Sequence, residues 1–263
     1  MLLLVLNLGT TQTVEVGPGQ ELNVVSGGSG DAVVILPGLS GCAYGFRNIV
    51  GPLQESGFRT VIIEPLGFGS SSRPRDADYT LTAQADRIAK VMDELGLTDA
   101  LVVAHGVSAS VALRMVYRRP DLVMSVLSIE GGPYESAATP AMERSLKFAG
   151  IIAKLGGGRL LRDQYRKNLE EASGDPSWID RRTLGRYLRN IDRDLNDFIA
   201  ALKAMARSEE PEALRDNLGR ITCPVTLLAG EAPHSGALTS AEIDILAAGL
   251  PYFEIKSVPG AGH

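Results

Sequence analysis

The chain has 263 residues, of which 44% are hydrophobic and 22% are charged, and its formal net charge at pH 7 is −5. This is typical of a globular protein with one large domain, or with one domain that carries an insertion. The acidic balance gives no basic footprint for nucleic acid. No apolar run reaches the ~18 residues that cross a membrane. We therefore expect a small organic molecule as the partner.

The two cysteines, Cys42 and Cys223, lie far apart and lack metal-ligand spacing. We expect both to be reduced and mostly buried. Residues 1–6 are apolar but have no basic region before them and no clear small-residue cleavage site. They fit a signal-peptide remnant, an edge strand or a misplaced start, and we favour a cytoplasmic protein.

Short apolar and β-branched runs alternate with helical patterns, which predicts a parallel sheet with crossover helices. The first expected unit is an antiparallel edge hairpin, with strands at 13–16 and 22–25 and a turn at 17–19. Six further strands are expected after it: 33–36, 60–63, 101–104, 126–129, 225–229 and 253–258. Most of these are nearly continuous apolar runs, as in strands that are covered on both faces.

Two helices are predicted between these strands. The segment 80–96 places apolar residues at helical spacing on one face, with Thr80 or Thr82 able to cap its start and Gly96 its end. The segment 107–118 is apolar on most sides and should lie buried against the sheet.

The pattern of apolar and polar residues changes at about residue 136. Strand signals vanish as far as residue 213, and helical periodicity is broken at 156–158 and 174–176. We expect a helical cap at 136–213, inserted into a core that is formed by 1–135 and 214–263.

Two segments near the start of the chain resemble loops of the α/β-hydrolase superfamily. Residues 35–40 resemble the strand and loop that build the oxyanion hole, with Pro37 where histidine is usual. Residues 64–71 are similar to the turn D-x-x-G-x-G-x-S, with Glu64 in place of aspartate.

The later segments strengthen this resemblance in the correct order. Residues 104–120 match the strand, elbow and helix that present the family's nucleophile, and Ser108 fits a sub-pattern H-S-x-S-A. Residues 258–263 are similar to the loop that carries the catalytic histidine. The resemblance implies an α/β-hydrolase fold: a mostly parallel sheet of eight-strand type, flanked by helices, with a helical cap. The family's closing helix does not follow His263, so the chain looks truncated there.

The resemblance puts Gly106 at the nucleophile position. Glycine tolerates the backbone angles of an elbow, so the turn should form. Covalent attack from this residue is impossible, and loss of the serine from a serine hydrolase typically lowers turnover by roughly 10⁶-fold. A register two residues later would centre the elbow on Ser108, but it would lengthen the strand and break the helix match.

Ser108 is a weaker candidate nucleophile. Successive helical residues are rotated by about 100°, so its side chain should point away from the elbow. Its ordinary role would be to satisfy backbone donors in the first helical turn. Ser110 is a still weaker candidate.

The resemblance makes His263 the candidate general base. His105 precedes the elbow apex and is expected to be a structural neighbour. His234 falls in a predicted loop, where we expect its side chain to be solvated.

The carboxylate that would orient the base is ambiguous. The family often places an aspartate shortly after the strand at 225–229, but Glu231 follows there. Other branches place the acid after the preceding strand, where Glu130 stands. A carboxylate at the carboxyl end of a central parallel strand faces the ligand crevice, which favours Glu130.

The substrate and oxyanion site is expected at Gly38, Leu39, Ser40 and Val107. We expect a hydrolase of small esters or similar organic molecules, with a replaced nucleophile or with water activated by His263. One alternative is a small-molecule binding or receptor protein that has lost the chemistry. Another is a non-hydrolytic lyase or cyclase on the same fold. No metal or organic cofactor is implied.

Overall fold

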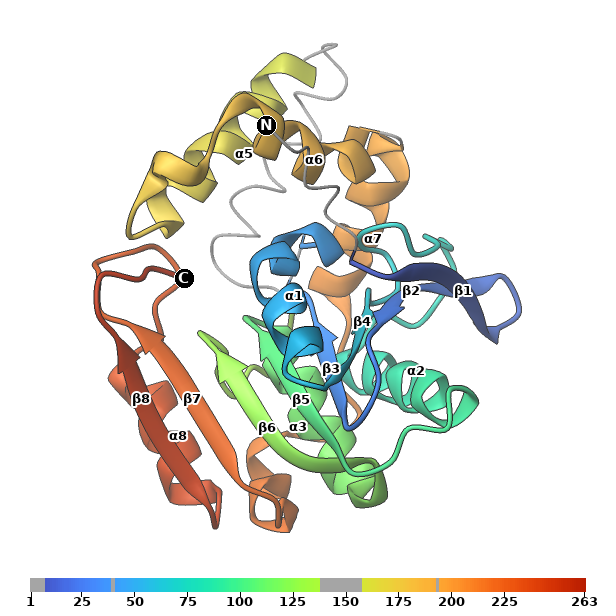
Figure 1. Cartoon of the computed structure of the whole chain (residues 1–263), viewed down its shortest axis with the longest axis vertical. Helices are drawn as coiled ribbons and strands as arrows, with labels where there is room; N and C mark the ends of the chain where they lie inside the picture. Colours follow the sequence, from blue (N-terminus) through green and yellow to red (C-terminus); the bar gives the residue numbers. More distant parts are fainter. Residues whose placement is uncertain (1–7, 39–40, 138–157, 193) are drawn as a thin grey trace.

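The computed structural model describes residues 8–38, 41–137, 158–192 and 194–263. In these residues an eight-stranded sheet runs in the order β1-β2-β4-β3-β5-β6-β7-β8 (Figure 1). β1 (Thr10–Gly17) and β2 (Gln20–Gly27) form the expected antiparallel hairpin at one edge. β2 also pairs antiparallel with β4 (Arg59–Ile63), and the other neighbours are parallel. The predicted fold class is confirmed.

The remaining strands lie where the apolar runs predict them. They are β3 (Ala32–Leu36), β5 (Ala100–His105), β6 (Val123–Ile129), β7 (Val225–Gly230) and β8 (Phe253–Val258). Along β3, Val34 and Leu36 face the core that α2 and α3 complete, whereas Val33 and Ile35 face a second core shared with α1. Because side chains alternate across a strand, a strand covered on both faces must be apolar throughout.

Helices cover both faces of the sheet. They are α1 (Arg47–Glu55), α2 (Leu81–Glu94), α3 (Ser108–Arg118) and α8 (Ser240–Gly249). The Thr80 side chain accepts a hydrogen bond from the backbone of Ala83 and caps α2, and Gly96 follows that helix at a φ of +62°. Short 3-10 turns occupy Ala43–Phe46, Pro120–Leu122, Pro176–Trp178 and Arg215–Arg220.

The described residues between β6 and β7 contain helices and no strand, as predicted. These are α5 (Gly158–Ala172), α6 (Arg181–Asp192) and α7 (Leu195–Arg207). α5 and α6 lie beyond the carboxyl ends of the parallel strands, and α7 runs back toward the sheet (Figure 1). The part of the predicted cap at 138–157 lies outside the described residues.

The two cysteines are free thiols. Cys42 is buried and Cys223 is half-buried. Burial raises the pKa of the Cys42 thiol to about 11, so this thiol is unreactive at neutral pH. No helix among the described residues is long and apolar enough to cross a membrane.

Candidate active site

A sharp turn joins β5 to α3. Gly106 forms its apex at a φ of +55°, directly after β5 ends at His105. Its N–H donates to the Ile129 carbonyl at 2.8 Å, and the Ala109 N–H donates to the Gly106 carbonyl at 3.0 Å. A left-handed residue between a strand and a buried helix is the geometry of a nucleophile elbow. The alternative register is wrong, because the positive φ falls on Gly106, whereas Ser108 is the first residue of α3.

Parallel strands end at the same edge of a sheet, and the candidate residues meet there. Glu130 follows β6 and has a φ of +50°, which is uncommon for a residue with a side chain. Its carboxylate is buried and accepts a hydrogen bond from the Gly230 N–H at the end of β7. This hydrogen bond holds the carboxylate across the ends of the paired strands β6 and β7.

His263 faces the elbow. A Cβ atom on Gly106 would lie 3.4 Å from Nε2 of His263, and a Cβ atom on Gly236 would lie 3.3 Å from its Nδ1. The His263 N–H donates to the carbonyl of Ala172, the last residue of α5, at 2.8 Å. The ring is therefore held with one nitrogen toward Gly236 and the other toward the nucleophile position.

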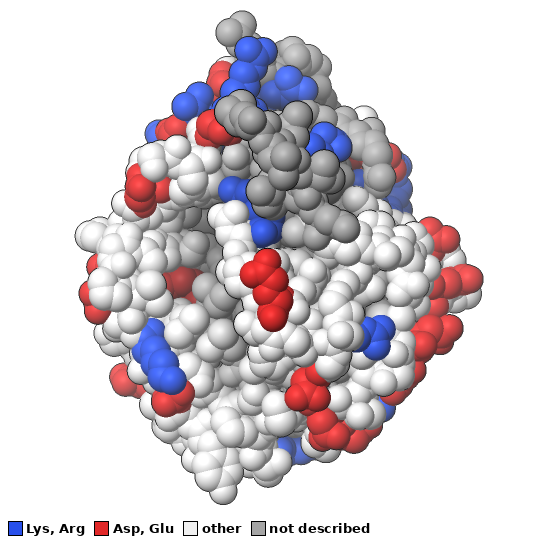
Figure 2. Space-filling view, viewed as in Figure 1, with Lys and Arg blue, Asp and Glu red and all other residues white. Residues whose placement is uncertain are grey.

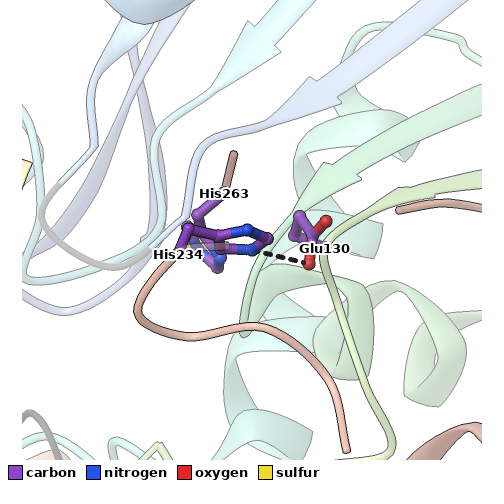
Figure 3. A group of neighbouring side chains, drawn as sticks. All are labelled: Glu130, His234 and His263. Carbon is purple, nitrogen blue, oxygen red and sulfur yellow. Dashed lines mark ion pairs between the residues drawn. The ribbon is translucent and has the colours of Figure 1, made fainter. Parts of the chain in front are cut away.

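All three histidines of the sequence gather at this edge. The ring centre of His263 lies 4.8 Å from that of His105 and 6.0 Å from that of His234. Nε2 of His234 lies 3.4 Å from Oε2 of Glu130, and the His234 side chain is only 1% exposed (Figure 3). The prediction of a solvated His234 is wrong, because the loop after β7 folds back over the carboxyl end of β6.

The surroundings keep the His263 ring neutral at physiological pH. Burial lowers the pKa of His263 to about 4; His105 and His234 also lower it, whereas the charge of Glu130 and a hydrogen bond with the Gly236 backbone raise it. As a whole residue His263 is exposed, but its ring packs against His105 and Gly236, and the ring is the part that titrates. Burial also lowers the pKa of His105, against a hydrogen bond with the His263 backbone.

The structure brings one of the two candidate acids to the histidines. The ligand atoms of Glu130, His234 and His263 all lie within 4.8 Å of one another. Glu231 is exposed, and its N–H donates to the Val258 carbonyl at 3.1 Å, which extends the pairing of β7 with β8. Glu130 therefore stands where a carboxylate can stabilise a protonated imidazole, and Glu231 does not.

The hydroxyl of Ser108 is engaged elsewhere. Its Oγ donates to the Pro37 carbonyl at 2.6 Å, and the residue is 2% exposed. The expectation that it serves donors of the first helical turn is wrong, because the loop after β3 passes within reach of its hydroxyl. Ser110 accepts from the Tyr134 N–H and donates to the Gly132 carbonyl. Both serines fix loops around the elbow.

The expected oxyanion segment is only partly described. A Cβ on Gly38 would lie 2.6 Å from Nδ1 of His105, so the close approach of this loop to the elbow requires glycine. Leu39 and Ser40 lie outside the described residues. Val107 is buried at the start of α3. A mostly apolar cavity adjoins it, with a lining that includes Pro37, Gly38, Phe68, Val107, Ser108 and Met205.

The comparison with known families agrees with this geometry. The profile of the alpha/beta hydrolase fold family matches residues 31–208. The chain belongs to the α/β-hydrolase fold family. The predicted resemblance is therefore confirmed for the family and the fold.

Two curated relatives of this α/β hydrolase are hydrolases by name. It is 26% identical over 212 residues to the 2-hydroxy-6-oxononadienedioate/2-hydroxy-6-oxononatrienedioate hydrolase of a Pseudomonas species, covering 74% of this chain and 71% of the relative. It is 28% identical over 253 residues to the 2-(acetamidomethylene)succinate hydrolase of Mesorhizobium japonicum, covering 92% and 84%.

The crystal structure of wild-type Cfl2 from Burkholderia cenocepacia superimposes on this α/β hydrolase with a TM-score of 0.77. The superposition covers 96% of this chain and 89% of that one at 21% identity, which supports the fold alone.

Sequence reasoning missed one residue of the cluster. His234 lies four residues after β7 ends at Gly230, and Glu130 directly follows the end of β6 at Ile129. This shared position after neighbouring strands was the available signal, because carboxyl ends of parallel strands converge. Whether such a side chain turns inward depends on the path of the loop. A local sequence pattern does not predict that path.

Proposed function

We propose that this chain is a hydrolase of small esters or related organic substrates in which water takes the place of the missing nucleophile. The observation that carries the proposal is the 3.4 Å distance between Nε2 of His263 and the site of a Cβ on Gly106. This distance supports an arrangement of elbow and base like that of a serine hydrolase without its nucleophile side chain. A water molecule beside Gly106 would lie within hydrogen-bond reach of that nitrogen.

The residues suggest a direct route for hydrolysis. Neutral His263 takes a proton from this water as the oxygen attacks the substrate's acyl carbon, and later returns the proton to the leaving group. The buried carboxylate of Glu130 stabilises the imidazolium that forms between these steps. The Val107 N–H, at the start of α3, is available to the developing oxyanion.

The helices between β6 and β7 would form a cap over this edge of the sheet, with the core at 1–135 and 214–263. The cavity beside Val107 is small, and the apolar side chains around it favour a weakly polar acyl group. The names of both curated relatives describe acids with two carboxyl groups. Lys and Arg side chains lie at the α5 and α6 end of the face in Figure 2, interspersed with Asp and Glu. A substrate panel should therefore hold both neutral aryl esters and dicarboxylates.

We place the protein in the cytoplasm.

The test compares the wild-type chain with Gly106→Ser and Gly106→Ala in buffer that contains EDTA. We expect slow hydrolysis by the wild type and a rise of at least about 10³-fold for Gly106→Ser, since a serine nucleophile accounts for up to roughly 10⁶-fold in turnover. Gly106→Ala has the same backbone strain without a hydroxyl, and should not gain. His263→Ala should abolish both the slow and the restored activity.

Two results would count against this function. If the wild type and folded His263→Ala had equal turnover, His263 would not activate water. Gly106→Ser that is folded but no more active than Gly106→Ala would show that the elbow does not serve acyl chemistry.

A binding protein is the second candidate. Pro37 and Gly106 both depart from the family pattern at positions that serve the chemistry, and neither change disturbs the fold. This reading predicts that a ligand from the panel raises the melting temperature of the wild type without being consumed. Product detection by mass spectrometry separates it from slow hydrolysis and from a lyase or cyclase.

A further inference from the structure

Two imidazoles and one carboxylate converge from three separate loops at the sheet edge. Glu130 follows β6, His234 lies in the loop after β7, and His263 lies in the segment after β8 (Figure 3). Each offers one ligand atom, and these atoms lie within 4.8 Å of one another. Mixed nitrogen and oxygen donors of this kind suit divalent transition metals rather than Mg²⁺ or Ca²⁺, which prefer oxygen.

The orientation of His234 supplies an independent observation. Its Nδ1 lies 2.7 Å from the Ala232 carbonyl. Because a carbonyl can only accept, Nδ1 must carry a proton. A histidine that binds a metal commonly donates its other ring N–H in this way. Nε2 is thereby turned toward Glu130.

A buried ring nitrogen of His234 faces a buried carboxylate oxygen of Glu130. Nε2 of His234 is buried and makes no hydrogen bond, and it lies 3.4 Å from Oε2 of Glu130. The other carboxylate oxygen of Glu130 is held by the Gly230 N–H. A ring nitrogen and a carboxylate oxygen that face each other in a buried site need a proton or a metal ion between them. The nearby His263 ring adds a third donor atom. A shared proton needs only two such atoms, whereas a bound metal ion needs more.

We propose that Glu130, His234 and His263 bind a divalent transition metal ion, with Zn²⁺ as the test case. Zinc with ligands at about 2.1 Å places tetrahedral donors about 3.4 Å apart, so the set must contract from within 4.8 Å. Gly106 places no side chain beside His263, which leaves room for a water molecule as the fourth ligand. Three protein ligands and one open position are typical of accessible zinc sites.

This proposal stands apart from the hydrolase proposal, although both use His263. An imidazole that coordinates a metal through one nitrogen carries its proton on the other, and so cannot accept another proton. The metal-bound chain and the water-activating chain are therefore alternative states. Zn²⁺ should inhibit Gly106→Ser, whereas hydrolysis in EDTA is independent of metal binding, so each proposal can fail alone.

The experiment is calorimetric titration of the whole, chelator-treated chain with ZnCl₂ at pH 7. We expect one ion per chain with a dissociation constant in the micromolar range or tighter, and a higher melting temperature with Zn²⁺. His234→Gln and Glu130→Gln keep the side-chain volume, and each should weaken binding by at least tenfold. Glu231→Gln is the matched control for Glu130→Gln, because Glu231 is an exposed carboxylate after the neighbouring strand and lies outside the donor set, and it should bind as the wild type does.

Two outcomes would overturn the site. One is wild-type chain that is folded by circular dichroism and binds no stoichiometric Zn²⁺. The other is binding that His234→Gln leaves unchanged, which would move the ion to other residues. If a variant fails to fold, the visible absorption of Co²⁺ bound to the wild type reports the nitrogen and oxygen donors directly, and a spectrum of octahedral hexaaqua Co²⁺ would contradict the proposal.

Discussion

Gly106 holds a backbone conformation that a serine can adopt only with strain. At a φ of +55° a Cβ atom crowds the neighbouring carbonyl, which raises the free energy of an L-residue by about 1–2 kcal/mol. Gly106→Ser should therefore lower the free energy of unfolding by about that amount while it raises hydrolysis. Urea denaturation measures the loss.

Gly185→Ser is the control for this stability loss. Gly185 lies in α6 with no heavy atom within 4 Å of an added Cβ, and it has no positive φ. A serine there should be neutral or slightly stabilising because serine has a higher helix propensity than glycine. A Gly106→Ser variant as stable as the wild type would mean that the left-handed turn is not kept.

Glu64 is a buried acid that makes stability depend on pH. Its carboxylate accepts hydrogen bonds from Asn23 Nδ2 at 2.9 Å, from the Ala43 N–H at 2.8 Å and from the Ser70 N–H at 2.6 Å. Burial raises the pKa of Glu64 above its ordinary value although these donors oppose it. The protonated form is thus favoured by folding. This contribution to the free energy of unfolding is complete below about pH 4.5, the ordinary pKa of a glutamate, and is lost as pH rises through the pKa of Glu64 in the folded state.

Glu64→Gln tests this sign. The glutamine oxygen can keep the hydrogen bonds from Asn23 and Ser70, but the glutamine NH₂ group would face the Ala43 N–H. The variant should therefore be less stable than the wild type at every pH. The stability gap between wild type and variant should narrow from pH 4 to pH 7, by about 1.4 kcal/mol for each unit of the pKa shift. Glu94→Gln, at an exposed position of α2, is the control. A gap that widens with pH would contradict the direction of the shift.

At the scale of elements, a buried arginine joins α3 to both ends of the segment between β6 and β7. The Arg114 side chain is fully buried, with Nη2 3.0 Å from Glu135 and Nε 3.3 Å from Glu210. Glu210 also accepts from the Leu81 N–H at the start of α2, and Glu135 accepts from the Leu214 N–H. One charge therefore fixes where the helical segment leaves the sheet and where it returns.

Arg114→Met should be strongly destabilising. It leaves Glu210, whose side chain is 6% exposed, without its cation, and breaking a buried pair in this way costs about 3–5 kcal/mol. Arg118→Met is the control one turn along α3: its pair with Asp86 is 36% and 53% exposed, so the change should stay within about 1 kcal/mol. Equal denaturation midpoints for the two variants would show that Arg114 is not the link between these elements.

Local patterns predict the elements of this fold well and their tertiary links poorly. The apolar runs locate the strands within about three residues because β3, β4 and β5 must be apolar on both faces. The elbow is predictable because a glycine between a buried strand and a buried helix indicates a sharp turn. Arg114 reads as an ordinary helical arginine, and His234 as an ordinary loop histidine. Both turn inward because of partners that lie far away in the sequence.

At the scale of the whole molecule, α5 helps to set the position of the candidate base. The Ser235 N–H donates to the Glu171 carbonyl at 3.0 Å, and the His263 N–H donates to the Ala172 carbonyl at 2.8 Å. A Cβ on Gly262 would lie 2.3 Å from the Ala172 carbonyl oxygen. The last turn of α5 and the segment after β8 therefore meet through backbone atoms, with no space for a side chain.

Gly262→Ala should consequently move His263 while leaving the core intact. Because a misplacement of about 1 Å can lower a rate by 10²-fold, hydrolysis by Gly106→Ser should fall about a hundredfold when Gly262→Ala is added, with little change in the urea midpoint. Gly51→Ala is the control, since an added Cβ in α1 has no heavy atom within 4 Å. Unchanged hydrolysis in the folded double variant would mean that the base is positioned by the sheet edge alone, without α5.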